Sequence, residues 1–267
     1  MKQVLKSLAH KTLAVMNVFP TRMTDRGEFQ SLLQKLYPVS TNKELIRLGP
    51  DGDGGYLVPN DLEGIEACFS PGIGFVSGFE KDCADRGMKV FLADKSAKQP
   101  AKAHKLFHFT KKFIGVTTDD AFMTCDDWVN SSLPESRSDL LLQIDIEGYE
   151  YEVFLSMSDI LMNRFRIIVA EFHQLDQFWS EPFFNVAARA FEKIVQTHTC
   201  VHIHPNNFDG FLQIGGLKVP QTAEFTFLRN DRIANPSYQR VFPNPLDSDN
   251  HPHRPSLTLP RCWYGGE

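Results

Sequence analysis

The sequence predicts an α/β protein with a doubly wound, mostly parallel sheet. Two observations lead to this fold class. Short apolar runs typical of buried strands alternate with amphipathic stretches typical of helices through the middle of the chain. The chain has 267 residues, of which 42% are hydrophobic and 23% charged, so it can bury the core of one large domain.

A helical N-terminal extension is expected over residues 1–45. Apolar side chains recur there at helical spacing, namely Phe29, Leu32, Leu33 and Leu36. The first twenty residues are basic and mildly amphipathic, without the long apolar run of a spanning helix or the cleavage pattern of a signal peptide. We interpret them as a helix packed on the domain, with a loose membrane-surface contact as the alternative.

The sheet domain is expected over residues 46–234. Apolar runs predict strands at 56–59, 65–70, 89–94, 108–116, 139–145, 165–173, 200–206 and 224–230. Amphipathic stretches predict helices at 79–87, 120–130, 149–161 and 182–198. A Gly-rich loop, 208–221, replaces a helix between the last two strands, which predicts an antiparallel final strand. Residues 235–267, rich in Pro, Asn and His, predict an extended arm over the surface.

Charge and cysteine usage narrow the function classes. The net charge is −5 with a pI near 6.0, and Lys111–Lys112 is the only lysine doublet, so the composition argues against nucleic acid as a partner. The five cysteines are scattered and form no CxxC pair or zinc spacing. This pattern indicates a reducing, cytoplasmic location. The sequence carries no signal for an oligomeric state.

A glycine turn follows the strand predicted at 65–70. Gly72 and Gly74 of the PGIG segment would let a ligand approach the backbone at the start of the next helix, although such segments also form simple turns. Asp94 ends the next strand about 20 residues later, where nucleotide-binding sheets place an acid on the ribose. Gly78 comes one place late for a GxGxxG fingerprint, which favours an adenosyl ligand without a pyrophosphate over NAD.

Acids and a histidine stand at the ends of two further strands. Asp145 and Glu147 share a strand face, and Glu171 and His173 do the same on the following strand. These groups suit a divalent ion or a general base beside an acceptor hydroxyl. The alternative is that Glu147 and Glu150 interact with the start of the following helix.

Two other motifs carry polar side chains that could serve a site. His202 and His204 share a strand face near the same edge and are candidate acceptor-site residues. Asp51 and Asp53 of the DGDG segment resemble the start of a calcium loop, but the Glu that such a loop requires is missing. We interpret this segment as a tight turn whose backbone could close over a cofactor.

The block TCDDWVN…SDLLLQIDIEGYEYEVF resembles the signature of the FkbM-type methyltransferases. The matching positions are Thr124, Asp126, Asp127, Asp145, Glu147, Gly148 and Glu150, with Cys125 where Leu is usual. The DGGYLVP segment, the PGIG turn and Asp94 agree with this group in order and spacing. The resemblance implies a class I, Rossmann-like fold that binds S-adenosylmethionine. Such enzymes usually carry an acid just before the glycine turn, and Ser70 takes that place here.

The resemblance implies an S-adenosylmethionine-dependent O-methyltransferase acting on a small-molecule or carbohydrate acceptor. The expected cofactor-binding residues are Ser70, Gly72, Gly74, Asp94 and Asp145. The expected catalytic residues are Asp145, Glu171 and His173, and the same three would hold a Mg²⁺ or Mn²⁺ ion. The alternatives are an NAD(P)-dependent oxidoreductase and an inactive nucleotide-binding domain.

Overall fold

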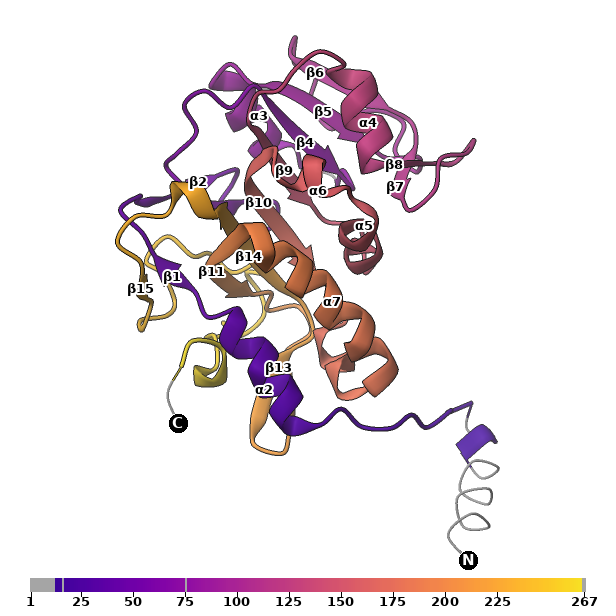
Figure 1. Cartoon of the computed structure of the whole chain (residues 1–267), viewed down its shortest axis with the longest axis vertical. Coiled ribbons are helices and arrows are strands. Elements are labelled where there is room, and N and C mark those ends of the chain that lie inside the picture. Colours follow the sequence, from indigo (N-terminus) through magenta and orange to yellow (C-terminus); the bar gives the residue numbers. More distant parts are fainter. Residues whose placement is uncertain (1–12, 16, 75, 266–267) are drawn as a thin grey trace, which may run out of the picture.

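The computed structural model describes residues 13–15, 17–74 and 76–265 and has a seven-stranded sheet at its centre (Figure 1). The strand order across the sheet is β11-β14-β10-β9-β4-β5-β6. In chain order these strands are β4 (Ala67–Pro71), β5 (Lys89–Ala93), β6 (Phe107–Thr110), β9 (Leu140–Ile144), β10 (Phe165–Phe172), β11 (His198–Pro205) and β14 (Ala223–Arg229).

Four of the six strand pairings in this sheet are parallel. β10, β9, β4, β5 and β6 run in one direction, whereas β14 lies antiparallel between β10 and β11. The prediction of an antiparallel last strand is therefore confirmed. The chain builds the sheet outward in one direction from β4 and in the other from β9, so the strand order reverses between these two strands. Ligands of open α/β sheets bind at the carboxyl ends of strands beside such a reversal.

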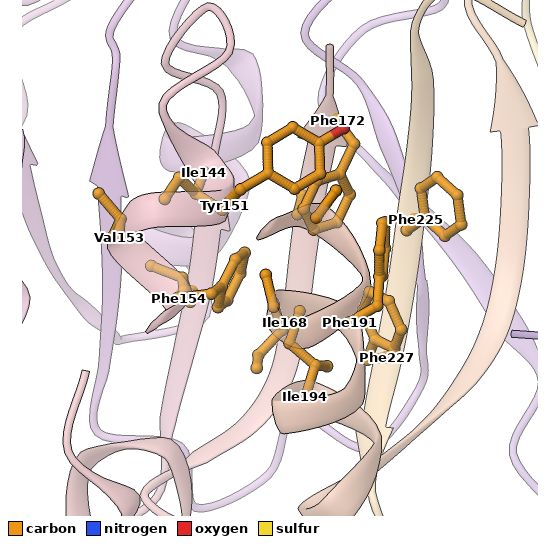
Figure 2. Close-up of a cluster of buried hydrophobic side chains, with 14 of the residues drawn as sticks. Ile144, Tyr151, Val153, Phe154, Ile168, Phe172, Phe191, Ile194, Phe225 and Phe227 are labelled. Atoms are coloured by element: carbon orange, nitrogen blue, oxygen red, sulfur yellow. The ribbon is translucent and has the colours of Figure 1, made fainter. Parts of the chain in front are cut away.

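Alternate residues of each central strand belong to two different cores. Leu142 and Ile168 pack in a large core with α5 (Glu150–Ser156) and α7 (Glu181–Thr197), as Figure 2 shows for its aromatic part. Leu141 and Ile167, one residue away, belong to a second core that includes residues of α3 (Gly78–Asp85). Since successive strand side chains point to opposite faces, both faces of the sheet are covered.

The N-terminal helix α2 (Arg26–Lys35) is part of the larger core. Asp25 caps it by accepting hydrogen bonds from the backbone N–H groups of Gly27 and Glu28. The ring of Phe29 meets that of Trp179 edge-on, with centroids 4.9 Å apart. The predicted helical spacing is thus confirmed for this stretch, whereas most of the helix expected over residues 1–20 lies outside the described residues.

Four short strand pairs surround the main sheet. They are β1 (Val39–Ser40) with β15 (Ser237–Tyr238), β2 (Leu45–Leu48) with β3 (Tyr56–Pro59), β7 (Phe113–Gly115) with β8 (Phe122–Thr124), and β12 (Phe211–Ile214) with β13 (Leu217–Pro220). The remaining helical segments are α4 (Cys125–Ser132), α6 (Asp159–Met162), η1 (Leu175–Trp179), η2 (Asn230–Arg232) and η3 (Arg261–Trp263).

Four of the expected elements divide or change. The helix expected at 120–130 is confirmed only from Cys125, because residues 122–124 form β8 and Thr124 caps α4. The strand expected at 108–116 is wrong as a single element, because a turn in which Lys112 N donates to Thr110 O separates β6 from β7. The helix expected at 149–161 breaks because Ser158 caps α6. The loop expected at 208–221 is the β12–β13 hairpin, with both turn glycines at positive φ.

The C-terminal arm is mostly irregular and returns to the core near its end. Trp263 is fully buried, and its indole N–H donates to the carbonyl of Lys218 over 3.1 Å. Its ring meets Phe225 edge-on. Within the described part of the chain, no helix combines the length and the apolar character needed to cross a bilayer.

Candidate functional site

The glycine turn after β4 touches the end of β9. Gly72 has a φ of +82°, and a Cβ at this position would lie 1.6 Å from the backbone oxygen of Asp145. Only glycine fits such an approach and such a conformation. The structure therefore joins the predicted cofactor turn to the strand end that carries the first acid, on the two sides of the strand-order reversal.

The segment after Gly72 leaves open space and unused hydrogen-bonding groups. A Cβ at Gly74 would meet no atom within 4 Å. Ser77 is buried at the start of α3, where its hydroxyl neither caps the helix nor finds another partner. An uncapped helix N-terminus carries free N–H groups and a partial positive charge, so this corner fits an anionic group such as a carboxylate.

Asp94 lies directly after β5, at the same sheet edge. The carboxylate oxygen Oδ1 accepts hydrogen bonds from the backbone N–H groups of Ser96 and Ala97 and from the Ser96 hydroxyl. The side chain is thus held in place by its own turn. Its expected contact with a ribose stays a prediction.

Ser70 lies below the turn rather than on its surface. Its hydroxyl is fully buried, 2.7 Å from Oε1 of Glu80 and 2.7 Å from Oε1 of Gln143. Burial raises the pKa of Glu80, whose side chain comes from α3. Because the hydroxyl is bonded to these partners, the Ser70 side chain stabilises the turn from the protein interior. Only the backbone of Ser70 could make the expected contact with the cofactor.

The acids after β9 converge on one imidazole. Nε2 of His173 lies 3.8 Å from Oδ1 of Asp145 and 3.5 Å from Oε2 of Glu147. Strand alternation does not produce this meeting, because β9 ends at Ile144 and Glu147 has a φ of +60°. The turn that contains Glu147 and Gly148 brings the Glu147 carboxylate back toward the imidazole of His173.

Glu150 stabilises both the turn after β9 and the position of His173. Its side chain is fully buried, and Oε1 accepts hydrogen bonds from the backbone N–H groups of Ile146 and Gly148 and lies 3.2 Å from Nδ1 of His173. The sequence assigned Glu150 to the following helix, and it does begin α5. Its second role, orienting His173, was missed, although the DxEGxE spacing was visible.

The pKa values at this edge follow from burial and mutual charge. Burial raises the pKa of Asp145 to about 7, against the opposing effect of His173. Burial alone would lower the pKa of His173, but the hydrogen bond to Glu150 and the surrounding carboxylates raise it to about 9. The imidazole is therefore cationic at neutral pH and neutralises part of the acid charge.

Glu171 lies in a second row of polar groups that continues across the sheet. It pairs across the strands with Glu224, which in turn pairs with His204. Oε1 of Glu171 accepts a hydrogen bond of 2.7 Å from the amide of Asn206. Burial first, and then Asp145 and Glu224, raise the pKa of Glu171 well above its usual range. Burial and the neighbouring acids therefore favour the protonated form of Glu171.

The group that could hold a metal ion differs from the predicted set. Among the described residues, the ligand atoms of Asp145, Glu147 and His173 lie within 4.8 Å of one another. The prediction named Glu171 in place of Glu147. The difference arises because Glu171 is buried and bonded to Asn206, whereas the turn after β9 redirects Glu147 toward the imidazole.

His202 and His204 hold the C-terminal arm. Nε2 of His202 lies 2.8 Å from Oδ1 of Asp247, and Nδ1 of His204 lies 3.6 Å from its Oδ2. A second arm residue, Asn250, donates to Glu224 over 2.8 Å. The two histidines therefore join the arm to β11, and their expected role at an acceptor stays a prediction.

The DGDG segment forms the turn between β2 and β3, as predicted for its local structure. Arg47 holds the turn by donating to the carbonyls of Pro50 and Gly52. The N–H of Gly49 donates to Asp82 of α3, and a Cβ at Gly78 would lie 2.6 Å from Pro50. The turn therefore packs beside the start of α3, next to the glycine turn.

The upstream acids of the signature block support the fold. Thr124 caps α4 through a hydrogen bond from the N–H of Asp127. Asp126 accepts hydrogen bonds from the N–H and the hydroxyl of Ser158, the residue that caps α6. These residues join two helices and do not reach the His173 cluster.

Fold and geometry together define an α/β domain whose candidate site lies where the strand order reverses. The model of the Methyltransferase FkbM domain matches residues 67–202, about half of the chain, from β4 into β11. The chain therefore belongs to the FkbM methyltransferase family, and the resemblance read from the signature block is confirmed. A comparison with curated proteins gave no match.

Proposed function

We propose that this protein is an S-adenosylmethionine-dependent O-methyltransferase that acts on a hydroxyl of a small molecule or a glycan. The observation that carries the proposal is the contact of Gly72 with Asp145, which joins the glycine turn to the acid cluster. Membership of the FkbM family supports methyl transfer. The proposal includes a doubly wound, Rossmann-like domain over residues 46–234 with a helical extension before it.

The residues of the turn fit this cofactor. The open space at Gly74, the unpaired hydroxyl of Ser77 and the uncapped start of α3 would receive its methionine end. Asp94 would face the ribose hydroxyls. When bound, S-adenosylmethionine supplies an electrophilic methyl group on a sulfonium centre.

The acid cluster would prepare the acceptor. The backbone of Asp145 touches the glycine turn, and we propose that its carboxylate accepts the proton of the acceptor hydroxyl. His173, held by Glu150, would orient Asp145 and balance its charge. Glu171, bonded to the amide of Asn206, would lie beside them as a neutral group. The chain would also have to align the hydroxyl with the methyl group and exclude water.

A Mg²⁺ or Mn²⁺ ion between Asp145, Glu147 and His173 is a second arrangement within this proposal. Their ligand atoms are close enough, and Glu150 fixes the other imidazole nitrogen as carboxylates do behind metal-bound histidines. Such an ion would lower the pKa of the acceptor hydroxyl. Turnover that survives chelation and does not respond to added Mg²⁺ or Mn²⁺ would remove this arrangement.

Calorimetric titration with S-adenosylmethionine tests the central proposal. Binding is expected, with no binding of NADH. The Asp145→Asn variant is expected to lose turnover about 10²–10⁴-fold, the range for a general base. Absence of S-adenosylmethionine binding at high micromolar concentration would sink the proposal, and binding of NADH would favour an oxidoreductase. Asp145→Asn turning over like the wild type would remove the role of Asp145.

A further inference from the structure

Lysines gather in one segment of this acidic chain. Between Asp94 and Phe113 stand six of the fifteen lysines, two histidines, no arginine and no acid. The segment contributes +6 to a chain of net charge −5, so all other residues together carry −11. It forms the loop after β5, the outermost strand β6 and the turn to β7, at the end of the molecule opposite α2 (Figure 1).

These lysines differ from the others in their lack of partners. Outside the segment, each of the six lysines that the structure describes has one: Lys35, Lys43, Lys81 and Lys89 form ion pairs, Lys193 donates to two carbonyls, and Lys218 lies over the ring of Phe211. Inside it, Lys112 donates to the carbonyl of Asp119, and the charges of Lys112 and Lys95 act on the Asp119 carboxylate. The five exposed lysines of the segment form no ion pair with any described carboxylate; they are Lys95, Lys98, Lys102, Lys105 and Lys111.

Exposed apolar side chains adjoin the lysines. Phe113 and Phe122, paired across β7 and β8, are 37% and 38% exposed, and Val116 is 48% exposed. Asp119 lies between Val116 and Phe122 in the sequence, and its carboxylate accepts hydrogen bonds from the backbone N–H groups of Ala121 and Phe122. The surface thus offers positive charge next to groups that can enter an interfacial layer.

We propose that this lysine surface, residues 95–112 with Phe113, Val116 and Phe122, binds the face of an anionic lipid bilayer. Lysine is a compact charge on a flexible stem and suits diffuse headgroup charge, whereas directed recognition of single phosphates uses the arginine fork. The total absence of arginine from the segment favours the diffuse mode. The contact is peripheral and would hold the sheet edge, with the Asp94 end of the candidate site, near the membrane.

Co-sedimentation of the full chain with vesicles tests the proposal. The wild type is expected to bind phosphatidylcholine vesicles that contain phosphatidylserine, not phosphatidylcholine alone, and to dissociate as salt rises. Joint replacement of Lys98, Lys102 and Lys105 by Gln should weaken partitioning at least ~10-fold, since each lysine near such a surface contributes roughly a fivefold effect. Val116→Ser should weaken it without changing the charge.

Two control variants test whether the effect is specific to the lysines of this segment. Joint replacement of Lys35, Lys81 and Lys89 by Gln removes the same charge elsewhere and should leave binding within about twofold of the wild type. Joint replacement of Lys2, Lys6 and Lys11 by Gln examines the basic start of the chain and should also retain binding.

Five outcomes would overturn the proposal. The first two are a wild type that does not sediment with anionic vesicles and an equal loss in the Lys35, Lys81 and Lys89 variant. The next two are a loss confined to the Lys2, Lys6 and Lys11 variant and a Lys98, Lys102 and Lys105 variant that binds normally. Aggregation of that last variant would mean that these lysines protect the edge strand from pairing with other molecules. Binding to an oligonucleotide without binding to vesicles would identify a different partner and equally refute it.

Discussion

Nδ1 of His173 lies 3.2 Å from Oε1 of Glu150, a fully buried carboxylate that also accepts two backbone N–H groups. The residue that orients the imidazole therefore comes from the start of α5, not from the neighbouring strand. This contact fixes the position of His173 and contributes to its charge. The backbone hydrogen bonds that Glu150 accepts from Ile146 and Gly148 hold the turn that places Glu147.

Replacing Glu150 by Gln is expected to lower the pKa of His173 from about 9 toward or below 6.5. The substitution removes the negative charge that raises this pKa and replaces a charged hydrogen-bond acceptor by a neutral one, while burial, which lowers the pKa, remains. Titration of the ring nitrogens by NMR measures the change. Glu152→Gln, an exposed charge on the same helix, is the control and should leave the pKa in place. An unchanged value in Glu150→Gln would refute the role of Glu150.

Gly74→Val is expected to abolish S-adenosylmethionine binding while keeping the fold. A Cβ there meets no atom within 4 Å, and the residue is exposed, so the free energy of unfolding should change by no more than about 0.5 kcal/mol. The added side chain would fill the space proposed for the cofactor. Calorimetry and urea unfolding separate the two effects, and normal cofactor affinity in this variant would place the cofactor elsewhere.

Gly72→Ala should behave in the opposite way. Its methyl group would overlap the backbone oxygen of Asp145, and the positive φ adds strain, so a loss of at least ~3 kcal/mol in the free energy of unfolding is expected. Urea unfolding measures it. A stable variant would show that β4 and β9 can separate at this point.

Acid should destabilise the fold through His198. Its side chain is buried with Nε2 2.7 Å from the carbonyl of Phe165, and burial lowers its pKa to about 4. In the unfolded chain this histidine has its ordinary pKa of about 6.5, so it takes up a proton there before it does in the folded protein. Its contribution to the free energy of unfolding is therefore present at neutral pH and is lost as the pH falls. Between pH 7 and pH 5 the expected loss is about 2 kcal/mol. The His198→Gln variant, compared by urea unfolding at both pH values, should lack this part of the loss; an identical pH dependence would contradict the assignment.

The C-terminal arm should prove essential to stability through Trp263. Trp263→Ala would empty a buried site and remove the indole N–H that donates to the carbonyl of Lys218, at an expected cost of about 3–5 kcal/mol. Thermal unfolding measures the effect. His253→Ala, at an exposed position of the same arm, should change little. Similar melting temperatures for both variants would show that the arm end does not support the core.

The sheet and its order of elements could be predicted because LLLQI, FRIIVAEF and the glycine stops carry strong local signals. Asp145, His173 and Gly72 could be placed at one edge because parallel strands end together. The place of Glu147 could not be predicted, since its positive φ breaks the strand alternation on which that prediction rested. Glu150 was assigned to the helix that it begins, but its contact with His173 could not be predicted. The partners of Glu171 could not be predicted either, because Glu224 and Asn206 reach it only through the pairing of distant strands.

The position of β14 has a consequence for biosynthesis. β10 exposes an open edge, and β11 has no neighbour in the sheet, until the ribosome has delivered residues 223–229 to fill the gap between them. The half of the sheet that carries Glu171 is therefore completed only when β14 has emerged, after all other strands of the sheet. Nascent chains interrupted before β14 would present two unpaired strands, so we expect this protein to depend on chaperones until β14 is available.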